Sequence, residues 1–283
     1  MPHRAGNAGL PEHCGARPMI KSILMCPPQF FDIEYEINPW MDLDNPVRTD
    51  QAGLQWRALY NLYTSELGWE VRLIEPVEHL PDMVFTANGG LVIGGKVALP
   101  RFRQPERTGE TALFEQWFRA QGFTEVFQPR HDFEGEGDAL LWNDILFAGY
   151  PWRSDRPAHE EIARFFGVQV VGLQLTDARF YHLDTAFTVV DEHTVALYPA
   201  AFTDQSLEAV HRLVPQVIEA TEGDALGYGL NAVCGGGHVV ISDRAEALAG
   251  IYRQRGLTVH PMPIDEFQKS GGGMKCLSLE LSH

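Results

Sequence analysis

Residues 166–170, Phe166-Gly167-Val168-Gln169-Val170, join the end of an amphipathic helical segment to a Val-rich strand through one glycine. Glycine commonly follows a helix because it adopts the left-handed conformation at little cost. The same order of helix, glycine and strand recurs at Leu67-Gly68-Trp69-Glu70-Val71, Gln121-Gly122-Phe123 and Arg255-Gly256-Leu257-Thr258-Val259. These glycines are 54, 45 and 89 residues apart, and 89 is close to twice 45, so we expect a degenerate copy between the last two, with its helix over 204–220.

A second repeated feature is a polar or glycine-rich leading segment followed by paired apolar strands. Five copies of about 45 residues account for most of a single domain over residues 20–283. The last copy stops before its helix, and residues 21–26 could complete it by closing the chain into a ring without exposed sheet edges. The five copies are expected at Phe85–Leu99, Gly137–Ala148, His182–Leu197, Asn231–Ser242 and Gly273–Leu281.

This periodicity predicts an α/β fold, a fivefold pseudosymmetric α/β propeller of five ββαβ-type repeats. In such a ring the five leading segments would meet around one central cavity. The alternative is an ordinary α/β sheet with loosely similar βα units. The contents of the leading segments favour the ring, since unrelated surface loops need not each carry a different reactive group.

Composition limits the classes of protein to which the chain can belong. With 283 residues and 45% hydrophobic content it can bury a substantial core. A formal net charge of −16 argues against a nucleic-acid partner. No stretch is apolar enough to cross a membrane, and residues 1–19 lack the apolar run of a signal peptide. We therefore expect a flexible N-terminal extension over 1–19 and a cytoplasmic protein, with a homo-oligomer possible.

Four cysteines are widely spaced, and none forms a CxxC pair. This spacing predicts reduced thiols rather than a disulfide framework or a zinc site. The sequence also lacks a HExxH motif, a dinucleotide fingerprint and a Walker motif, so we expect neither a metal nor a cofactor. The cysteines are Cys14, Cys26, Cys234 and Cys276.

Cys276 follows the glycine run 271–273 and precedes Leu277, Leu279 and Leu281. Strand alternation would direct its thiol away from the leucines, as expected of a presented nucleophile. The alternative is that Cys276 is one more small buried hydrophobic residue, which free cysteines usually are.

The leading segments together carry the groups of a covalent mechanism with general acid and base: a thiol, an imidazole and carboxylates. Taken singly, each group has a simpler explanation, such as a turn residue, a solvated acidic loop or a satisfied core histidine. His182 and Asp184 are two apart and would share one face of a strand. The candidates are Asp82 and Asn88 in the first copy, Glu134, Glu136 and Asp138 in the second, His182 and Asp184 in the third, and Cys276 in the last.

From Met25 to the end the chain resembles the pentein, or guanidino-group-modifying, superfamily of fivefold α/β propellers. That superfamily includes arginine deiminases, dimethylarginine dimethylaminohydrolases and amidinotransferases, and the resemblance to arginine dihydrolases is strongest. Eight motifs in order carry it: Cys26-Pro27-Pro28, Ile37-Asn38-Pro39-Trp40-Met41, Pro81 to Gly90, Arg101 to Glu110, Phe133 to Leu141, Gly149 to Ser154, Arg179 to Thr185, and Gly272 to Leu279.

The resemblance implies a role for each residue that matches a motif. Cys276 would attack the guanidinium carbon, and His182 would protonate the departing amine and then activate water. Glu134 would hold the guanidinium and support His182, whereas Glu136 falls where the family pattern varies. Asp184 would bind guanidinium nitrogens through charge-assisted hydrogen bonds.

Further substrate contacts follow from the same resemblance. Arg107 and Arg153 match positions that clamp a substrate α-carboxylate, which suits the planar fork of arginine. Asn38 is implied as an additional polar contact. Asp82 and Asp138 complete the set of candidate substrate-binding residues.

Asn88 distinguishes between family members, because arginine deiminases and the dimethylarginine enzymes resemble one another in carrying aspartate there. An amide is both donor and acceptor and could accommodate a neutral ureido intermediate for a second hydrolysis. The resemblance thus implies hydrolysis of arginine, a small-molecule substrate, to ornithine, carbon dioxide and ammonia through a thiouronium adduct. The alternatives are a dimethylarginine dimethylaminohydrolase or arginine deiminase that forms citrulline, an amidinotransferase, and a noncatalytic binding protein of the same fold.

Overall fold

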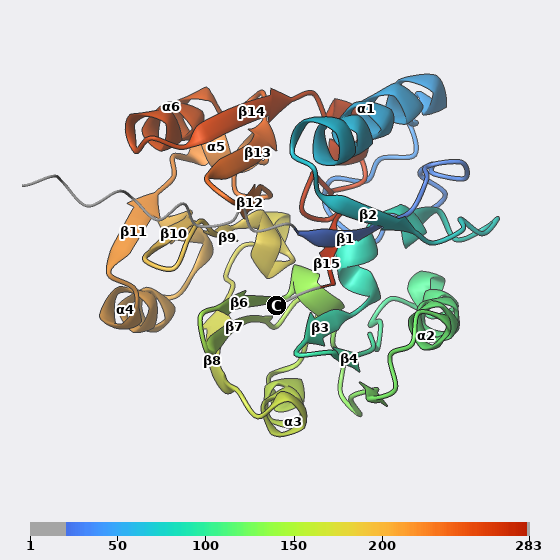
Figure 1. The fold of residues 1–283 in the computed structure, drawn as a ribbon, viewed down its shortest axis with the longest axis horizontal. Coiled ribbons are helices and arrows are strands. Elements are labelled where there is room, and N and C mark those ends of the chain that lie inside the picture. The colour runs from blue at the N-terminus through green and yellow to red at the C-terminus, as the bar shows by residue number, and fades with distance from the viewer. Residues whose placement is uncertain (1–20, 282–283) are drawn as a thin grey trace, which may run out of the picture.

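The computed structural model describes residues 21–281, so the extension expected over residues 1–19 lies outside the described residues. Five three-stranded sheets stand around a common centre, each with a helix on its outer side (Figure 1). In each sheet an antiparallel pair is followed by a helix and a third strand that runs parallel to the second. This arrangement confirms the predicted fivefold propeller of ββαβ repeats.

The strands are short and follow the predicted pairs. In order along the chain they are β1 (Ser22–Met25), β2 (Glu70–Leu73), β3 (Leu91–Ile93), β4 (Lys96–Ala98), β5 (Val126–Phe127), β6 (Ala139–Trp142), β7 (Ile145–Tyr150), β8 (Gln169–Gln174), β9 (Phe187–Val189), β10 (Thr194–Leu197), β11 (Gln216–Glu219), β12 (Val233–Gly235), β13 (His238–Ser242), β14 (Thr258–Met262) and β15 (Leu279–Glu280).

Each three-stranded sheet with its helix forms one blade of the propeller. Five helices connect the second and third strands of the blades. They are α1 (Thr49–Asn61), α2 (Glu110–Ala120), α3 (Arg156–Phe166), α4 (Asp204–Leu213) and α6 (Glu246–Gln254). A π-helical turn, Leu62–Glu66, extends α1. Two short helices lie in connections between sheets: α5 (Glu222–Leu226) between β11 and β12, and α7 (Asp265–Gln268) between β14 and β15.

The two ends of the described chain share one sheet. β15 pairs antiparallel with β1, which pairs in parallel with β2, and Leu24 is opposite Leu279. The expectation that residues 21–26 complete the last copy is therefore confirmed. Closing the ring pairs strands that a linear chain would leave exposed, and it fixes the C-terminal strand near the centre (Figure 1).

The helix boundaries follow from local sequence. α3 begins with Pro157 in its first turn and ends at Gly167, whose φ of 74° is the left-handed conformation that glycine adopts readily. The helix expected over 204–220 is shorter than predicted. It ends at Leu213, and the residues that follow include β11, which pairs with β10 to complete the sheet of β9, β10 and β11.

The core lies between neighbouring blades and is filled by strand residues and aromatic rings. One hydrophobic cluster joins the sheet of β6–β8 to the sheets of β9–β11 and β12–β14, and a second packs α1 against the segment that carries Cys276. The leading segments lie at the inner ends of the sheets and contain short 3-10 helices, among them Thr86–Gly89, Gly135–Gly137 and Leu183–Thr185. None of the described helices has the length and apolar character needed to span a membrane.

Candidate active site

Cys276 lies in a turn before β15 and not in the strand, which corrects the expectation from alternation. The Leu277 amide donates to the carbonyl of Gly273 at 3.1 Å, and the Ser278 amide donates to that of Lys275 at 2.9 Å. Pairing with β1 begins at Leu279, so the preceding residues are free to turn. The turn leaves Cys276 only 3% exposed.

Two side chains hold the Cys276 thiol. Asn231 Nδ2 donates to Cys276 Sγ at 3.1 Å, and Asn231 Oδ1 accepts from the Cys276 amide at 3.1 Å. The thiol in turn donates to Asp184 Oδ2 at 3.3 Å. The sequence pattern does not single out Asn231, although this residue begins the fourth strand pair, the copy to which no reactive group was assigned.

In the Cys276–Asp184 pair the thiol keeps its proton in the absence of substrate, and the carboxyl group titrates near neutral pH. Burial and then the charge of Asp184 raise the pKa of Cys276 far above that of a free thiol. Burial also raises the pKa of Asp184 to about 7, although the hydrogen bond from Cys276 opposes this shift. Asp184 Oδ1 is buried and has no hydrogen-bond partner among the described residues, so it is available to a ligand donor.

His182 and Glu134 form the second part of the site. His182 Nε2 lies 2.8 Å from Glu134 Oε2, and both side chains are buried. His182 precedes the 3-10 helix Leu183–Thr185, so it does not share a strand face with Asp184 as expected. The expectation assumed an extended backbone, and a turn forms there because the Thr185 amide donates to the carbonyl of His182 at 3.2 Å.

Glu134 is fully buried and ionised. Burial disfavours the charge, but Arg153 and then His182 outweigh it and lower the pKa of Glu134 to about 2. Arg153 Nη1 donates to Glu134 Oε2 at 3.0 Å, and the Arg103 amide donates to Glu134 Oε1 at 3.2 Å. The site thus holds a fixed negative charge beside an imidazole, as a general acid and base require.

A glycine allows the first and second leading segments to approach one another closely. Gly135 has a φ of 64°, and a Cβ atom there would lie 2.6 Å from the carbonyl oxygen of Ala87. A Cβ at Gly137 would clash with Asn88 Nδ2. The lack of side chains at both glycines brings Asn88 beside the segment that carries Glu134.

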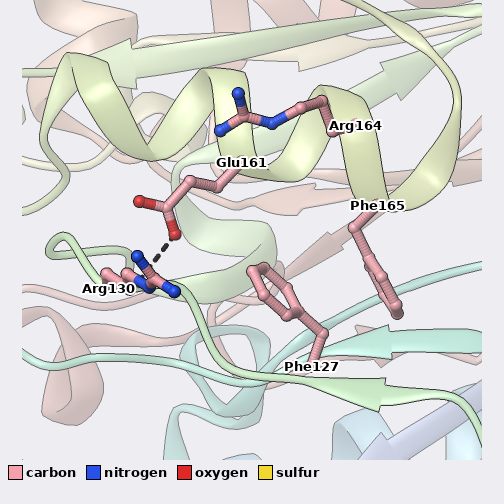
Figure 2. A pocket seen from close by; sticks show the side chains of 5 residues that line it. All are labelled: Phe127, Arg130, Glu161, Arg164 and Phe165. Atoms are coloured by element: carbon pink, nitrogen blue, oxygen red, sulfur yellow. Dashed lines mark hydrogen bonds between the residues drawn. The ribbon is translucent and has the colours of Figure 1, made fainter.

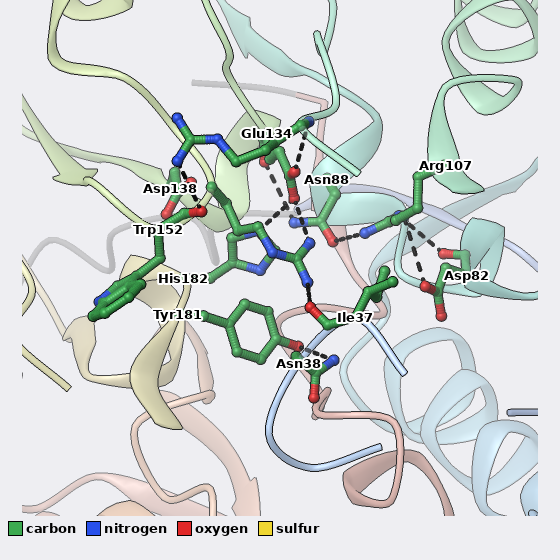
Figure 3. Close-up of polar contacts among 12 residues, drawn as sticks. Ile37, Asn38, Asp82, Asn88, Arg107, Glu134, Asp138, Trp152, Tyr181 and His182 are labelled. Atoms are coloured by element: carbon green, nitrogen blue, oxygen red, sulfur yellow. Dashed lines mark hydrogen bonds and ion pairs between the residues drawn. The ribbon is translucent and has the colours of Figure 1, made fainter. Parts of the chain in front are cut away.

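Asn88 is oriented by two partners, as Figure 3 shows. Arg107 Nη1 donates to Asn88 Oδ1 at 2.8 Å, and Asn88 Nδ2 donates to the carbonyl of Glu134 at 3.3 Å. Arg107 also makes a bidentate pair with Glu110, with both N–O distances at 2.8 Å. The buried Arg107 guanidinium is therefore already paired, a contact that the sequence did not reveal.

Arg153 contacts the loop after β1, in which Figure 3 shows Ile37 and Asn38 beside Tyr181. Arg153 Nη2 donates to the carbonyl of Ile37 at 2.9 Å, and its guanidinium lies 4.7 Å from the ring centre of Tyr181. Asn38 Nδ2 donates to the carbonyl of Ser270 at 3.1 Å. These contacts tie the loop to the Glu134 region.

Asp82 and Asp138 contact protein donors. Asp138 accepts from the Ser154 hydroxyl at 2.6 Å and from the Leu183 amide at 3.1 Å, and burial raises its pKa to about 6. Asp82 accepts from the Tyr35 hydroxyl at 3.1 Å. These bonds favour a role in fixing the leading segments, while direct contact with substrate stays a prediction.

Two cavities lie outside this cluster. A surface cavity of about 420 Å³ is lined by the stacked rings of Phe127 and Phe165 and by charged residues of the α3 region (Figure 2). A cavity of about 850 Å³ includes Lys275, Glu136 and Glu280 in its lining. Lys275 Nζ pairs with Glu136 at 2.8 Å, so Glu136 is an ion-pair partner of the residue before Cys276.

Comparison with known proteins identifies similar chains. The profile of a family described as "Arginine deiminase" matches residues 60–223. The chain is 43% identical over 264 residues to N(G),N(G)-dimethylarginine dimethylaminohydrolase of Mycobacterium tuberculosis. The aligned residues cover 93% of this chain and 87% of that protein.

Two further similarities involve dihydrolases. The bifunctional arginine dihydrolase/ornithine cyclodeaminase AgrE of Nostoc is 38% identical over 265 residues, which cover 92% of this chain but 37% of AgrE. The crystal structure of the N-terminal domain of ArgZ bound to product, described as an arginine dihydrolase from cyanobacteria, superposes with a TM-score of 0.88 at 38% identity. That match covers 93% of this chain and 97% of the domain.

Proposed function

The chain belongs to the arginine deiminase family, and we propose that it hydrolyses the guanidino group of arginine to ornithine, carbon dioxide and ammonia. The observation that carries the proposal is the Cys276 thiol, held by Asn231 and Asp184. The similarity to AgrE and to the ArgZ domain supports arginine as substrate, and Asn88 supports two hydrolytic steps.

In the first half-reaction the guanidinium group is bound by Asp184, whose Oδ1 is free to accept a hydrogen bond. A positive charge beside Cys276 favours the thiolate, because it offsets the burial that otherwise disfavours the charge. The thiol proton passes to His182, and the thiolate sulfur attacks the guanidinium carbon and forms a C–S bond. His182 protonates the departing nitrogen, the C–N bond breaks, and ammonia leaves a thiouronium adduct on Cys276.

In the second half-reaction His182, held by Glu134 at 2.8 Å, takes a proton from water. The hydroxide adds to the adduct carbon, the C–S bond breaks and the sulfur leaves with its electron pair, which yields a ureido group, that of citrulline. A second attack by Cys276 and a second water release another ammonia and a carbamate, which loses carbon dioxide to give ornithine. The net reaction consumes two waters per arginine.

A second candidate is hydrolysis of dimethylarginine to citrulline and dimethylamine. The 43% identity to the Mycobacterium tuberculosis protein favours it. The same residues would act, but the reaction would stop after one cycle of adduct formation and hydrolysis.

The test is to incubate the purified protein with L-arginine or dimethylarginine and to quantify ornithine, citrulline, ammonia and dimethylamine. We expect two ammonia per ornithine from arginine, without accumulating citrulline. Cys276→Ser should abolish turnover, whereas Cys234→Ser, at another buried cysteine, should retain it. Citrulline with one ammonia would establish a deiminase instead. Turnover of dimethylarginine alone would establish the second candidate, and turnover of neither substrate would contradict both proposals.

A further inference from the structure

Tyr228 has an unusual backbone conformation close to the candidate site. Its φ is 61°, in the left-handed region that bulky residues rarely adopt. The residue begins the turn in which the Asn231 amide donates to the Tyr228 carbonyl at 3.2 Å. Asn231 is one of the two side chains that hold the Cys276 thiol. Strain of this kind persists only where the surrounding structure enforces it, and it is concentrated at functional sites.

The hydroxyl of Tyr228 is buried without a partner. The residue is 2% exposed, and its OH group makes no hydrogen bond to any described residue. By contrast, the neighbouring Tyr181 hydroxyl donates to the Gly271 carbonyl at 2.6 Å. The Tyr228 ring packs against Trp40 with ring centres 5.0 Å apart, so the side chain is fixed. A buried hydroxyl normally has a partner, so a fixed hydroxyl without one beside the candidate site is available to a ligand.

The ionisable groups that act on the phenol belong to the site. Burial raises the pKa of Tyr228, and the charges of Tyr181, Cys276 and Asp184 raise it further. The phenol therefore keeps its proton and remains both a donor and an acceptor. Asp184 Oδ1 is the other site atom among residues 21–281 that is buried without a partner.

Arginine and citrulline, the substrates of the two proposed hydrolytic steps, differ in the hydrogen-bonding groups that they require beside Asp184. A guanidinium group offers only donors, which a carboxylate oxygen can accept. A ureido group replaces one nitrogen by a carbonyl oxygen, which needs a donor. Asn88 is committed in part, because its amide nitrogen donates to the Glu134 carbonyl and its oxygen accepts from Arg107.

We infer that Tyr228 is a substrate-binding residue whose hydroxyl accepts a hydrogen bond from the guanidinium of arginine and donates one to the ureido oxygen of citrulline. The inference rests on the proposed function and names the residue that lets one site bind both substrates. Loss of the hydroxyl affects the second hydrolysis more, because an acceptor oxygen without a donor is costly to bury, whereas the guanidinium retains Asp184.

The experiment compares Tyr228→Phe with Tyr252→Phe. Tyr252 is the matched control, since its hydroxyl is also buried without a partner among the described residues but lies in α6. We expect kcat/KM for citrulline to fall about tenfold or more in Tyr228→Phe. The value for arginine consumption should fall less than about threefold, and citrulline should accumulate. Tyr252→Phe should match the parent protein with both substrates. Equal losses for the two substrates, or no loss, would overturn the inference.

A binding measurement separates this inference from the proposed function. Calorimetry on Cys276→Ser, with and without Tyr228→Phe, reports affinity for citrulline and arginine without turnover. We expect citrulline to bind about tenfold more weakly when the hydroxyl is absent, with arginine affinity little changed. An unchanged citrulline affinity, or no citrulline binding to Cys276→Ser, would overturn the role of Tyr228. Absence of turnover in the parent protein, with the affinity difference retained, would instead reject the proposed function.

Discussion

His182 Nε2 lies 2.8 Å from Glu134 Oε2, and the same carboxylate oxygen accepts a hydrogen bond from Arg153 Nη1 at 3.0 Å. One buried oxygen therefore orients the imidazole and neutralises the guanidinium. Because Arg153 and His182 lower the pKa of Glu134 to about 2 against the effect of burial, the carboxylate stays charged at any pH at which the protein is assayed.

Glu134→Gln should lower kcat about 100-fold or more, because an amide cannot stabilise a protonated His182 and leaves Arg153 without its counter-charge. Steady-state assays with arginine measure this, and thermal melting checks that the variant folds. Glu161→Gln is the matched control, since Glu161 pairs with His131 at 2.6 Å near the surface. Retention of a third of the parent kcat by Glu134→Gln would contradict the assigned role.

Asp184→Asn should become more stable than the parent protein as pH rises. Burial raises the pKa of Asp184 to about 7, so the folded state keeps a proton that the unfolded chain releases near pH 4. The parent therefore loses stability between about pH 4 and 7, by on the order of 4 kcal/mol, and the neutral amide avoids this loss.

Melting temperatures of the two proteins from pH 4 to 8 measure the difference. We expect similar values at pH 4 and a higher value for Asp184→Asn at pH 8, where its hydrolase activity should nevertheless be lost. A constant difference across this range would show that Asp184 does not change its protonation between the folded and unfolded states in the expected way.

Asn88→Asp should convert arginine to citrulline and stop there. Arg107 lies 2.8 Å from Asn88 Oδ1, so the introduced carboxylate gains a counter-ion and the fold should tolerate it. A carboxylate holds a cationic guanidinium but binds a neutral ureido group less well. Product analysis gives the ratio of citrulline to ornithine, with Asn143→Asp, in an exposed turn, as control. Continued ornithine formation at the parent rate would refute this role of Asn88.

Gly135→Ala should destabilise the protein by about 3 kcal/mol, because it adds left-handed strain and a Cβ atom 2.6 Å from the Ala87 carbonyl oxygen. Gly167→Ala is the control. Gly167 has a φ of 74° but open space around the added atom, so we expect a loss of only about 1 kcal/mol. Urea unfolding of both variants tests the difference, and equal losses would mean that the contact at Gly135 relaxes without cost.

Arg107→Met should cost about 3–5 kcal/mol, because it leaves Glu110 buried without its bidentate partner. The double variant Arg107→Met/Glu110→Leu should recover at least half of that loss, since it removes the unpaired charge as well. Urea unfolding measures both. A single variant as stable as the parent would indicate that Arg107 serves the substrate rather than the fold.

Local sequence patterns were enough to predict the repeated unit. Glycines such as Gly167 end helices through backbone sterics, and alternating apolar residues specify short strands, so the five blades could be predicted from local pattern. Motif resemblance also singled out Cys276, His182 and Glu134. These features depend on residues close together in the chain, which is why the sequence reveals them.

Tertiary structure alone decided which side chains meet. The contact of Asn231 with Cys276 joins residues 45 apart, and the contact of Arg107 with Asn88 joins residues 19 apart. Alternation placed Cys276 in a strand, but closure of the sheet at Leu279 left it in a turn. Such contacts depend on the register and closure of the ring, which short-range patterns do not encode.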